Sequence, residues 1–199
     1  MAISGTDSYE GAQGLPEEVA RAVQLAKRLS FENSCRLEQG RLLQVIASGQ
    51  RGGVIGETGT GCGVGLSWML SAVDSSARLF SVEIDSDRAR ACQELFKSHA
   101  NVHVENAGWV TLFDYGPFDL LVLDGGGSGK TDTPVVVDEV LTVGGTLIID
   151  DFTPFTDWPP TYKGQIDEVR LFWLTHPNLL ATEIRLSDDL STIVAVRKV

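Results

Sequence analysis

The stretch GVIGETGTGCG, at residues 53–63, decides the fold of this chain. Its first five residues form a short apolar run typical of a buried strand, and residues 64–73 after it have the apolar content of a helix. Gly59, Gly61 and Gly63 alternate through the turn between them, where glycine lets the backbone bend sharply and approach a ligand closely. A helix that begins here directs free N–H groups toward that ligand. The stretch therefore predicts a strand, a ligand-binding turn and a helix, with a tight turn that holds no ligand as the alternative.

The same alternation continues to the end of the chain. Further strands are expected at 79–84, 102–105, 118–123, 145–149, 181–186 and 192–197, and further helices at 86–98, 134–141 and 164–176. Strands that alternate with helices predict an α/β fold, with a mostly parallel, Rossmann-like sheet of seven strands covered by helices on both faces. The last two strands are joined by a short turn, so one strand near the end should run antiparallel. Ligands of such sheets lie at the carboxyl ends of the strands.

The 199 residues predict a single domain. Residues 1–14 are polar and without periodicity, and we expect a loose tail there. Residues 15–48 predict two helices, at 15–29 and 36–48, with Ser34 as a cap of the second, and residues 53–199 form the α/β core. The first residues resemble no signal peptide and no apolar run is long enough to cross a membrane, so a cytoplasmic protein without a membrane partner is expected.

The charge balance and the cysteines narrow the choice of partners. Sixteen basic residues against 27 acidic ones give a net charge of −11, and no run of Lys or Arg interrupts the acidic composition. Such a chain repels polyanions, so no nucleic-acid partner is expected. The three cysteines, Cys35, Cys62 and Cys92, fit neither a disulfide framework nor a zinc motif and are expected to be free thiols.

The pattern of the turn separates two classes of nucleotide-like ligand. The dinucleotide fingerprint G-x-G-x-x-G needs a third glycine at position 64 or 66, where this chain has Val64 and Leu66. The pattern E-x-G-x-G-x-G instead resembles the first motif of class I S-adenosylmethionine-dependent methyltransferases. The stretch VEID at 82–85 follows about 20 residues later, at the end of the second expected strand. A carboxylate there can accept hydrogen bonds from both ribose hydroxyls, the role that the resemblance gives to Glu83.

The resemblance extends over roughly residues 37–199. The segments 102–108, 116–124 and 144–151 resemble the third, fourth and fifth strand motifs of the small O-methyltransferases, a group that includes catechol and caffeoyl-CoA O-methyltransferases. It implies the strand order 3-2-1-4-5-7-6, S-adenosylmethionine as cofactor, a small-molecule acceptor and, often, a homodimer. The cofactor-binding residues that it implies are Glu57, Gly59, Gly61, Gly63, Glu83, Ile84, Ala107, Gly108, Trp109 and Asp124. Trp109 beside the adenine and Trp109 as plain core remain alternatives.

Three aspartates match the metal ligands of that group. Asp124 ends the fourth expected strand, and Asp150 and Asp151 end the fifth. The resemblance implies that together they hold a divalent cation, and hard oxygen ligands suit Mg²⁺ or Ca²⁺. The alternative is that Asp124 faces the sulfonium while Asp150 and Asp151 are hydrogen-bonded turn residues.

The acid–base residue of the group is missing. A lysine three residues after the fourth-strand aspartate is its general base, and this chain has Gly127 there. Asp124 and Lys130 are the candidate catalytic residues, although the spacing of Lys130 differs from the pattern. A non-catalytic S-adenosylmethionine-binding protein is therefore a second hypothesis. A phosphate-binding loop at 125–131 is a third, but its match to G-x-x-x-x-G-K-[ST] fails at Asp124.

An aromatic, proline-rich segment at 152–162 follows the fifth strand. Stiffened aromatic residues are suited to form a wall of an acceptor pocket. Covering a dimer partner or the edge of the sheet is the alternative.

Overall fold

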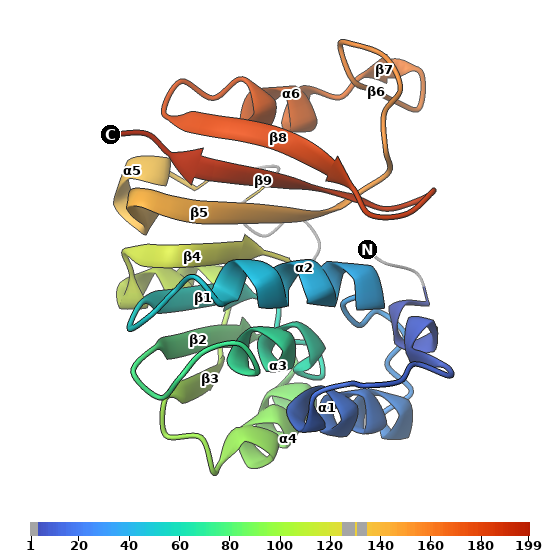
Figure 1. Cartoon of the computed structure of the whole chain (residues 1–199), viewed down its shortest axis with the longest axis vertical. Helices are drawn as coiled ribbons and strands as arrows, with labels where there is room; N and C mark the ends of the chain where they lie inside the picture. The colour runs from blue at the N-terminus through green and yellow to red at the C-terminus, as the bar shows by residue number, and fades with distance from the viewer. Residues whose placement is uncertain (1–3, 125–129, 131–134) are drawn as a thin grey trace.

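A computed structural model describes residues 4–124, residue 130 and residues 135–199 of the chain. Seven strands form one sheet in the order β3-β2-β1-β4-β5-β9-β8 (Figure 1). Counted within that sheet, this is the order 3-2-1-4-5-7-6, so the prediction is confirmed. The strands are β1 (Val54–Thr58), β2 (Arg78–Glu83), β3 (Val102–Asn106), β4 (Phe118–Leu123), β5 (Leu141–Phe152), β8 (Leu179–Arg185) and β9 (Ser191–Arg197).

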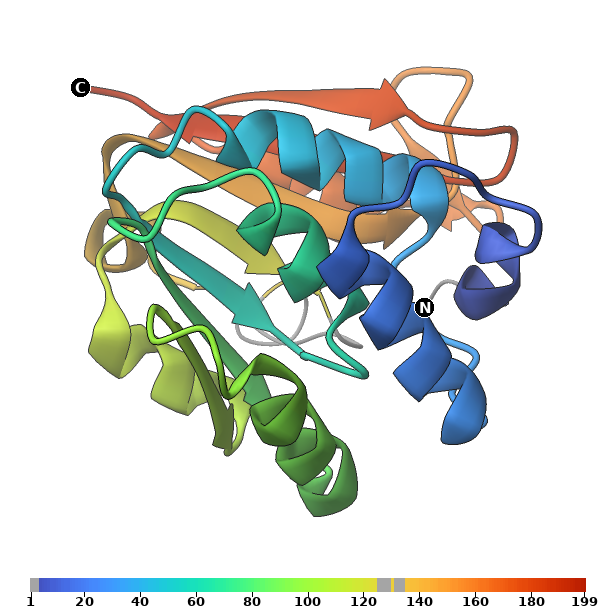
Figure 2. The same ribbon diagram turned by 60° about the horizontal axis from the view of Figure 1, so that its bottom comes forward.

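The strands β1 to β5 run parallel to one another, and β9 runs antiparallel to both β5 and β8. The centre of the sheet is buried on both faces, which explains why β4 is almost entirely apolar. Helices cover both faces, as Figure 2 shows from a second direction. On one face lie α1 (Glu17–Arg28), α2 (Leu37–Ala47), α3 (Val64–Leu70) and α4 (Ser86–Phe96); on the other lie the 3₁₀-helix η2 (Trp109–Tyr115), α5 (Val137–Val140) and α6 (Glu168–Leu174).

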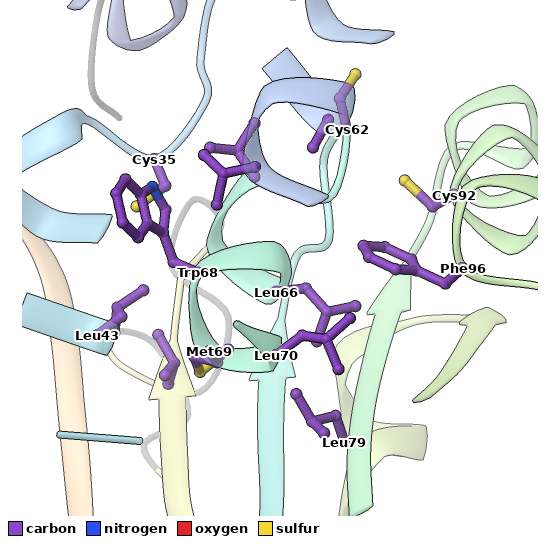
Figure 3. Packing of buried hydrophobic residues seen from close by; sticks show 14 of the residues in the cluster. Cys35, Leu43, Cys62, Leu66, Trp68, Met69, Leu70, Leu79, Cys92 and Phe96 are labelled. Atoms are coloured by element: carbon purple, nitrogen blue, oxygen red, sulfur yellow. The ribbon is translucent and has the colours of Figure 1, made fainter. Parts of the chain in front are cut away.

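The helix α3 connects the glycine turn to the core. All seven of its residues are buried, because α1 and α2 cover the side of α3 that faces away from the sheet. Leu66, Trp68 and Met69 therefore pack in different directions around one helix (Figure 3). A helix that is apolar on all sides is expected only at such an interior position. The position of the turn at 59–63 is fixed by this packing. The three cysteines are free and buried, as predicted.

The N-terminal prediction of a loose tail is wrong for residues 5–9. They form a 3₁₀-helix, η1 (Gly5–Tyr9), whose Thr6 and Tyr9 are buried. The Thr6 hydroxyl donates a hydrogen bond to Ser34 Oγ at 2.7 Å. Ser34 is therefore not the cap of α2, whose N-cap is Arg36 without a side-chain hydrogen bond. Residues 5–9 are polar and have no apolar periodicity, and a few buried hydrogen bonds fix their position instead of a buried apolar face.

The expected helix at 134–141 is also wrong in extent. The helix α5 has four residues, Val137–Val140, and β5 begins at Leu141; residues 131–134 lie outside the described part of the chain. Consecutive β-branched valines at 135–137 oppose helix formation, because their side chains restrict χ1. The strand β5 bends at its two glycines, where its pairing with β4 shifts in register.

The expected helix at 164–176 begins later, at Glu168, where the Asp167 side chain accepts a hydrogen bond from Arg170 N–H. Before it, β6 (Thr161–Tyr162) and β7 (Gln165–Ile166) form a small hairpin that the sequence reading did not include. Lys163 and Gly164 at its turn both have positive φ, 51° and 78°, as a two-residue hairpin turn of type I′ requires. Among the described residues, no helix is long and apolar enough to span a membrane.

Candidate functional site

A cavity of about 430 Å³ lies at the carboxyl ends of the parallel strands. It extends from the ends of β2 and β3, past the glycine turn after β1, to the ends of β4 and β5. The connection between α1 and α2 forms another part of its wall. The residues around it are Phe31, Asn33, Ser34, Cys35, Glu57, Gly59, Thr60, Gly61, Cys62, Val64, Gly65, Val82, Glu83, Ile84, Arg88, Ala107, Gly108, Trp109, Asp124, Asp150 and Asp151.

The backbone of the glycine turn adopts positive φ angles, which glycine tolerates and other residues rarely adopt. Gly59, Gly61 and Gly63 have φ values of 87°, 56° and 81°. The N–H groups of Gly59 and Thr60 both donate to Val82 O at 3.0 Å, so the turn is held against the end of β2. A Cβ atom at Gly61 would lie 3.0 Å from Phe31 Cε1, so any side chain there would crowd the Phe31 ring at the cavity wall.

Gly63 has a different role from the one predicted. It does not border the cavity, in contrast to Gly59 and Gly61. A Cβ atom there would lie 2.9 Å from Phe96 Cε2, on the helix α4. Gly63 therefore allows α3 to begin close to α4, and its contribution to the site is to place the turn.

The Glu83 carboxylate lies at one end of the cavity and is held by three donors. Its Oε2 accepts the N–H of Gly61 at 2.7 Å. Its Oε1 accepts the N–H of Asp85 at 2.9 Å and Nη2 of Arg88 at 2.9 Å. The guanidinium of Arg88 also lies over the ring of Phe31, 5.1 Å from its centroid. Because a carboxylate offers about four acceptor positions, a ribose that used both oxygens would share or displace one of these donors.

Glu57 lies deeper, below the glycine turn, and is 2% exposed. Its Oε2 accepts a hydrogen bond from the Ser81 hydroxyl at 2.7 Å, and Ser81 Oγ lies 2.6 Å from Thr60 Oγ1. Burial raises the pKa of Glu57 well above its usual value, and the charges of Asp124 and Glu83 raise it further, whereas the bond from Ser81 lowers it. Glu57 and Ser81 therefore form a chain of hydrogen bonds that connects β1, β2 and Thr60 of the glycine turn.

Four predicted residues form the side of the cavity near β3. Ile84, Ala107, Gly108 and Trp109 all border it. A Cβ atom built at Gly108 meets nothing within 4 Å, so there is open space beside the backbone at this point. Trp109 contacts Phe113 edge to face, with ring centroids 5.6 Å apart. Gly108 and Trp109 therefore border the cavity beside open space, on the side formed by β2 and β3.

The opposite end of the cavity is acidic. Asp124 follows β4, and Asp150 and Asp151 lie where the pairing of β5 with β9 is interrupted by a register shift. Successive strand residues normally point to opposite faces. The shift, together with φ of 70° at Asp151, lets both aspartates border one cavity. Asp150 is 5% exposed, and its Oδ1 accepts the N–H of Asp151 at 2.7 Å.

The carboxylates at this end influence one another. Burial raises the pKa of Asp150 well above its usual value, and the charges of Asp124 and Asp151 raise it further. The nearby ammonium of Lys130 lowers it, and Lys130 Nζ donates to the carbonyl oxygen of Asp150 at 3.2 Å. Trp173 Nε1 donates a hydrogen bond to the carbonyl oxygen of Lys130 at 2.9 Å. Lys130 thus lies at the acidic end, behind the residues that border the cavity.

These aspartates are not arranged as metal ligands. In the described part of the chain, no three His, Cys, Asp or Glu side chains are grouped so that they would hold one metal ion. The donor set is hard and acidic, as Mg²⁺ or Ca²⁺ requires, but its geometry does not fit such an ion.

Two parts of the site were missed or misplaced by sequence reasoning. Four residues of the α1–α2 connection and one of α4 border the cavity: Phe31, Asn33, Ser34, Cys35 and Arg88. Nothing in their local sequence marks them, because the fold brings the α1–α2 connection over the glycine turn from a distance. The aromatic segment at 152–162, considered as a wall of an acceptor pocket, contributes none of the described residues that border this cavity. The predicted phosphate loop at 125–131 lies outside the described residues except for Lys130.

Comparison with known proteins shows what this chain resembles. Residues 57–152, from the glycine turn to the end of β5, match the model of a family described as a methyltransferase domain. A search of curated proteins finds no match.

Solved structures share the fold over nearly the whole chain. A methyltransferase from Geobacter sulfurreducens is 17% identical with a TM-score of 0.72, and the match covers 97% of this chain and 95% of that one. An O-methyltransferase from Bacillus cereus, solved in complex with S-adenosylhomocysteine, is 18% identical with a TM-score of 0.71 and coverage of 98% and 96%. The O-methyltransferase TomG from Streptomyces achromogenes, solved with S-adenosylmethionine, is 17% identical with a TM-score of 0.70 and coverage of 99% and 97%. Residues 57–152 thus resemble a methyltransferase domain, and the chain as a whole shares the fold of these solved methyltransferases.

Proposed function

We propose that this chain transfers a methyl group to an oxygen atom of a small acceptor, within the cavity at the carboxyl ends of β1, β2, β4 and β5. The observation that carries the proposal is that one cavity joins Glu83 and the glycine turn at one end to Asp124, Asp150 and Asp151 at the other. This arrangement supports a proposal in which the nucleoside and the reacting groups are bound side by side. The O-methyltransferase likeness of the solved structures supports oxygen as the accepting atom.

The residues present fit S-adenosylmethionine. The Glu83 carboxylate can accept hydrogen bonds from ribose hydroxyls, and the open space beside Gly108, with Trp109 next to it, suits a flat base. The acidic end suits a group that carries a sulfonium and an ammonium charge. S-adenosylmethionine supplies the electrophilic methyl group when it is bound, and the residues of this chain supply the binding, the alignment and the removal of a proton.

Alignment is the first contribution of the chain. A displacement at a methyl group needs the acceptor oxygen in line and near contact, and fixing that geometry is worth several kcal/mol of the barrier, on the order of 7 or more. The register shift at Asp150 and Asp151 and the hydrogen bond from Lys130 to Asp150 O hold this wall in place. We assign Lys130 a positioning role and place Asp124 beside the reacting groups.

Proton removal is the second contribution. The acceptor hydroxyl loses its proton as the new bond forms, and a base with a raised pKa is suited to take it. Asp150 is the proposed base, because burial and two neighbouring carboxylates raise its pKa. This assignment replaces the lysine that the small O-methyltransferases use, where this chain has Gly127. Since the aspartates do not fit a metal ion, no step of the proposal uses one.

Two measurements test the proposal. Calorimetry should show binding of S-adenosylhomocysteine, and Glu83→Ala should weaken it by about 1.5–3 kcal/mol, the range for hydrogen bonds to a charged group. The control Asp87→Ala removes an exposed acid of α4 that pairs with Arg90 and should leave affinity unchanged. Unchanged affinity in Glu83→Ala would move the ribose elsewhere.

The reaction is tested on a panel of phenols and aliphatic alcohols with labelled S-adenosylmethionine. The wild type should methylate at least one class of acceptor, and Asp150→Asn should lower kcat at saturating S-adenosylmethionine and acceptor. Binding without methyl transfer to any acceptor would instead support the non-catalytic hypothesis. The phosphate-binding hypothesis would require ATP to bind, and Lys130, its central residue, already donates to Asp150 O.

A further inference from the structure

A second cavity, of about 330 Å³, lies on the opposite side of β9 from the parallel strands. It is formed by α6, the outermost strand β8 and the segment that follows β5, which lie together at one end of the molecule (Figure 1). Its walls are Pro154, Phe155, Trp158, Leu174, residues 181–183 and Arg185. None of these residues borders the cofactor cavity, so this is a separate space.

One wall of the second cavity is aromatic. Phe155 and Trp158 are arranged edge to face, with ring centroids 6.3 Å apart. Trp158 is 61% exposed, which is unusual for the largest apolar side chain and is typical of binding surfaces. Pro154 and Pro159 flank the pair and restrict the backbone, so little conformational entropy is lost when a ligand binds against it.

The floor of the second cavity carries a carboxylate. The side chain of Glu183 is 8% exposed and borders the cavity from β8. Its Oε2 lies 3.5 Å from Arg170 Nη1, and neither atom has a hydrogen-bond partner in the described part of the chain. A buried carboxylate whose charge is only partly compensated is unfavourable, and a cation in the cavity that it borders would lower this cost.

The charges around Arg170 leave one negative charge in excess. Arg170 is 2% exposed and lies between two carboxylates, with Nε 3.3 Å from Asp167 Oδ2 and Nη1 3.5 Å from Glu183. Its guanidinium also donates to Thr153 O at 2.8 Å and faces the rings of Phe152 and Phe155. A single guanidinium therefore serves both carboxylates. Arg185, at the rim, pairs with Asp188 at 2.9 Å and adds no net charge.

We propose that the second cavity binds an organic ammonium group carried on an aromatic or apolar body. The ammonium would compensate the excess negative charge near Glu183, and the body would lie against Phe155 and Trp158. A cation beside aromatic faces and a carboxylate is favoured by both. The site is independent of methyl transfer, since it shares no residue with the cofactor cavity.

Isothermal titration calorimetry with phenethylamine tests the proposal, in the presence of saturating S-adenosylhomocysteine so that the cofactor cavity is occupied. We expect saturable binding with one site per chain. The matched neutral probe, 2-phenylethanol, should bind about tenfold more weakly, because it lacks the charge. Equal affinity of the two probes, or no saturable binding of the amine, would overturn the proposal.

Two variants and a control locate the site. Glu183→Gln should weaken phenethylamine binding about tenfold and should remove the preference over 2-phenylethanol. Loss of the Glu183 charge also disturbs buried Arg170, so a second variant, Trp158→Ala, is needed. The Trp158 side chain is exposed, and we expect this variant to stay folded and to lose a similar part of its affinity for phenethylamine. Tyr162→Ala, an exposed aromatic of β6 outside the cavity, is the control and should bind as the wild type does. Wild-type affinity in Trp158→Ala would show that the amine binds elsewhere.

Discussion

Two acidic residues of the cofactor cavity, Glu57 and Glu83, differ in how the chain compensates their charge. Glu83 accepts hydrogen bonds from three donors, including the guanidinium of Arg88. Glu57 has one donor, the hydroxyl of Ser81, and is surrounded by other acids. Both positions follow from the sequence, because acids at strand ends are visible in it. The different surroundings do not, because Ser81 and Arg88 reach the two carboxylates only in the folded chain.

Glu57 predicts a pH dependence of stability. Its pKa is raised in the folded state, so above its usual value of 4.5 the folded chain retains a proton that the unfolded chain has lost. The contribution of Glu57 to the free energy of unfolding therefore falls as pH rises from about 4.5 toward the folded pKa, with a slope of up to about 1.4 kcal/mol per pH unit. Glu57→Gln removes this loss, and urea unfolding between pH 5 and pH 8 should show that variant gaining stability over the wild type as pH rises.

The matched control for Glu57→Gln is Glu94→Gln, on the exposed surface of α4, where the side chain is 71% exposed. Its stability difference from the wild type should not change with pH over this range. Parallel pH curves for Glu57→Gln and the wild type would mean that Glu57 ionises normally in the folded chain.

At the scale of elements, the glycine turn and the α1–α2 connection depend on each other. Gly61→Val should abolish S-adenosylhomocysteine binding, because a Cβ atom there would lie 3.0 Å from Phe31 Cε1 at the cavity wall. The positive φ of 56° adds backbone strain of roughly 1–2 kcal/mol. The control is Gly11→Val, at φ of 71° with nothing within 4 Å of its Cβ position. Both variants should melt earlier in thermal denaturation, but calorimetry should show lost binding in Gly61→Val alone.

The N-terminal 3₁₀-helix η1 should contribute to stability through one hydroxyl. Tyr9 OH donates to Cys35 O at 2.9 Å and accepts from Trp68 Nε1 at 2.9 Å, and Tyr9 is 4% exposed. Tyr9→Phe leaves both partners buried without a hydrogen bond, so urea unfolding should show a loss of about 1–3 kcal/mol. Tyr162→Phe, on the exposed hairpin strand β6, should change stability little. An unchanged Tyr9→Phe would show that η1 does not hold this part of the chain.

Sequence patterns were enough to predict some helices and strands of this chain but not others. The strands of the sheet were predictable, because buried parallel strands are continuous apolar runs with few alternatives. The strand order followed only from the resemblance to the small O-methyltransferases. The segments 5–9 and 137–140 were not, because hydrogen bonds to Ser34 and Cys35 decide the first and valine sterics decide the second. Gly164 was a possible sign of the turn between β6 and β7. The turn itself is recognised only from the structure, in which Lys163 and Gly164 both have positive φ. Local patterns predict elements that carry their own periodicity, and long-range contacts decide the others.

At the scale of the whole molecule, the net charge of −11 acts against compactness. Like charges repel more strongly in the folded chain than in the extended one, and salt screens that repulsion. The screening length falls from about 30 Å at 0.01 M ionic strength to about 8 Å at 0.15 M. Added NaCl should therefore raise the melting temperature over this range. For a chain of this length, a gain of about 1 kcal/mol corresponds to roughly 2–4 °C.

Divalent cations separate screening from binding at the acidic end of the cofactor cavity. MgCl₂ at the same ionic strength as NaCl screens the whole surface, whereas a site formed by Asp124, Asp150 and Asp151 would add stability by mass action. Because no three such side chains are grouped as ligands in the described part of the chain, we expect MgCl₂ to shift the melting temperatures of the wild type and of an Asp150→Asn, Asp151→Asn double variant equally. Calorimetric scans of both proteins in matched NaCl and MgCl₂ measure this. An additional rise with MgCl₂ that only the wild type shows would mean that the cation draws the three carboxylates together, and the proposed reaction would then proceed beside a metal ion.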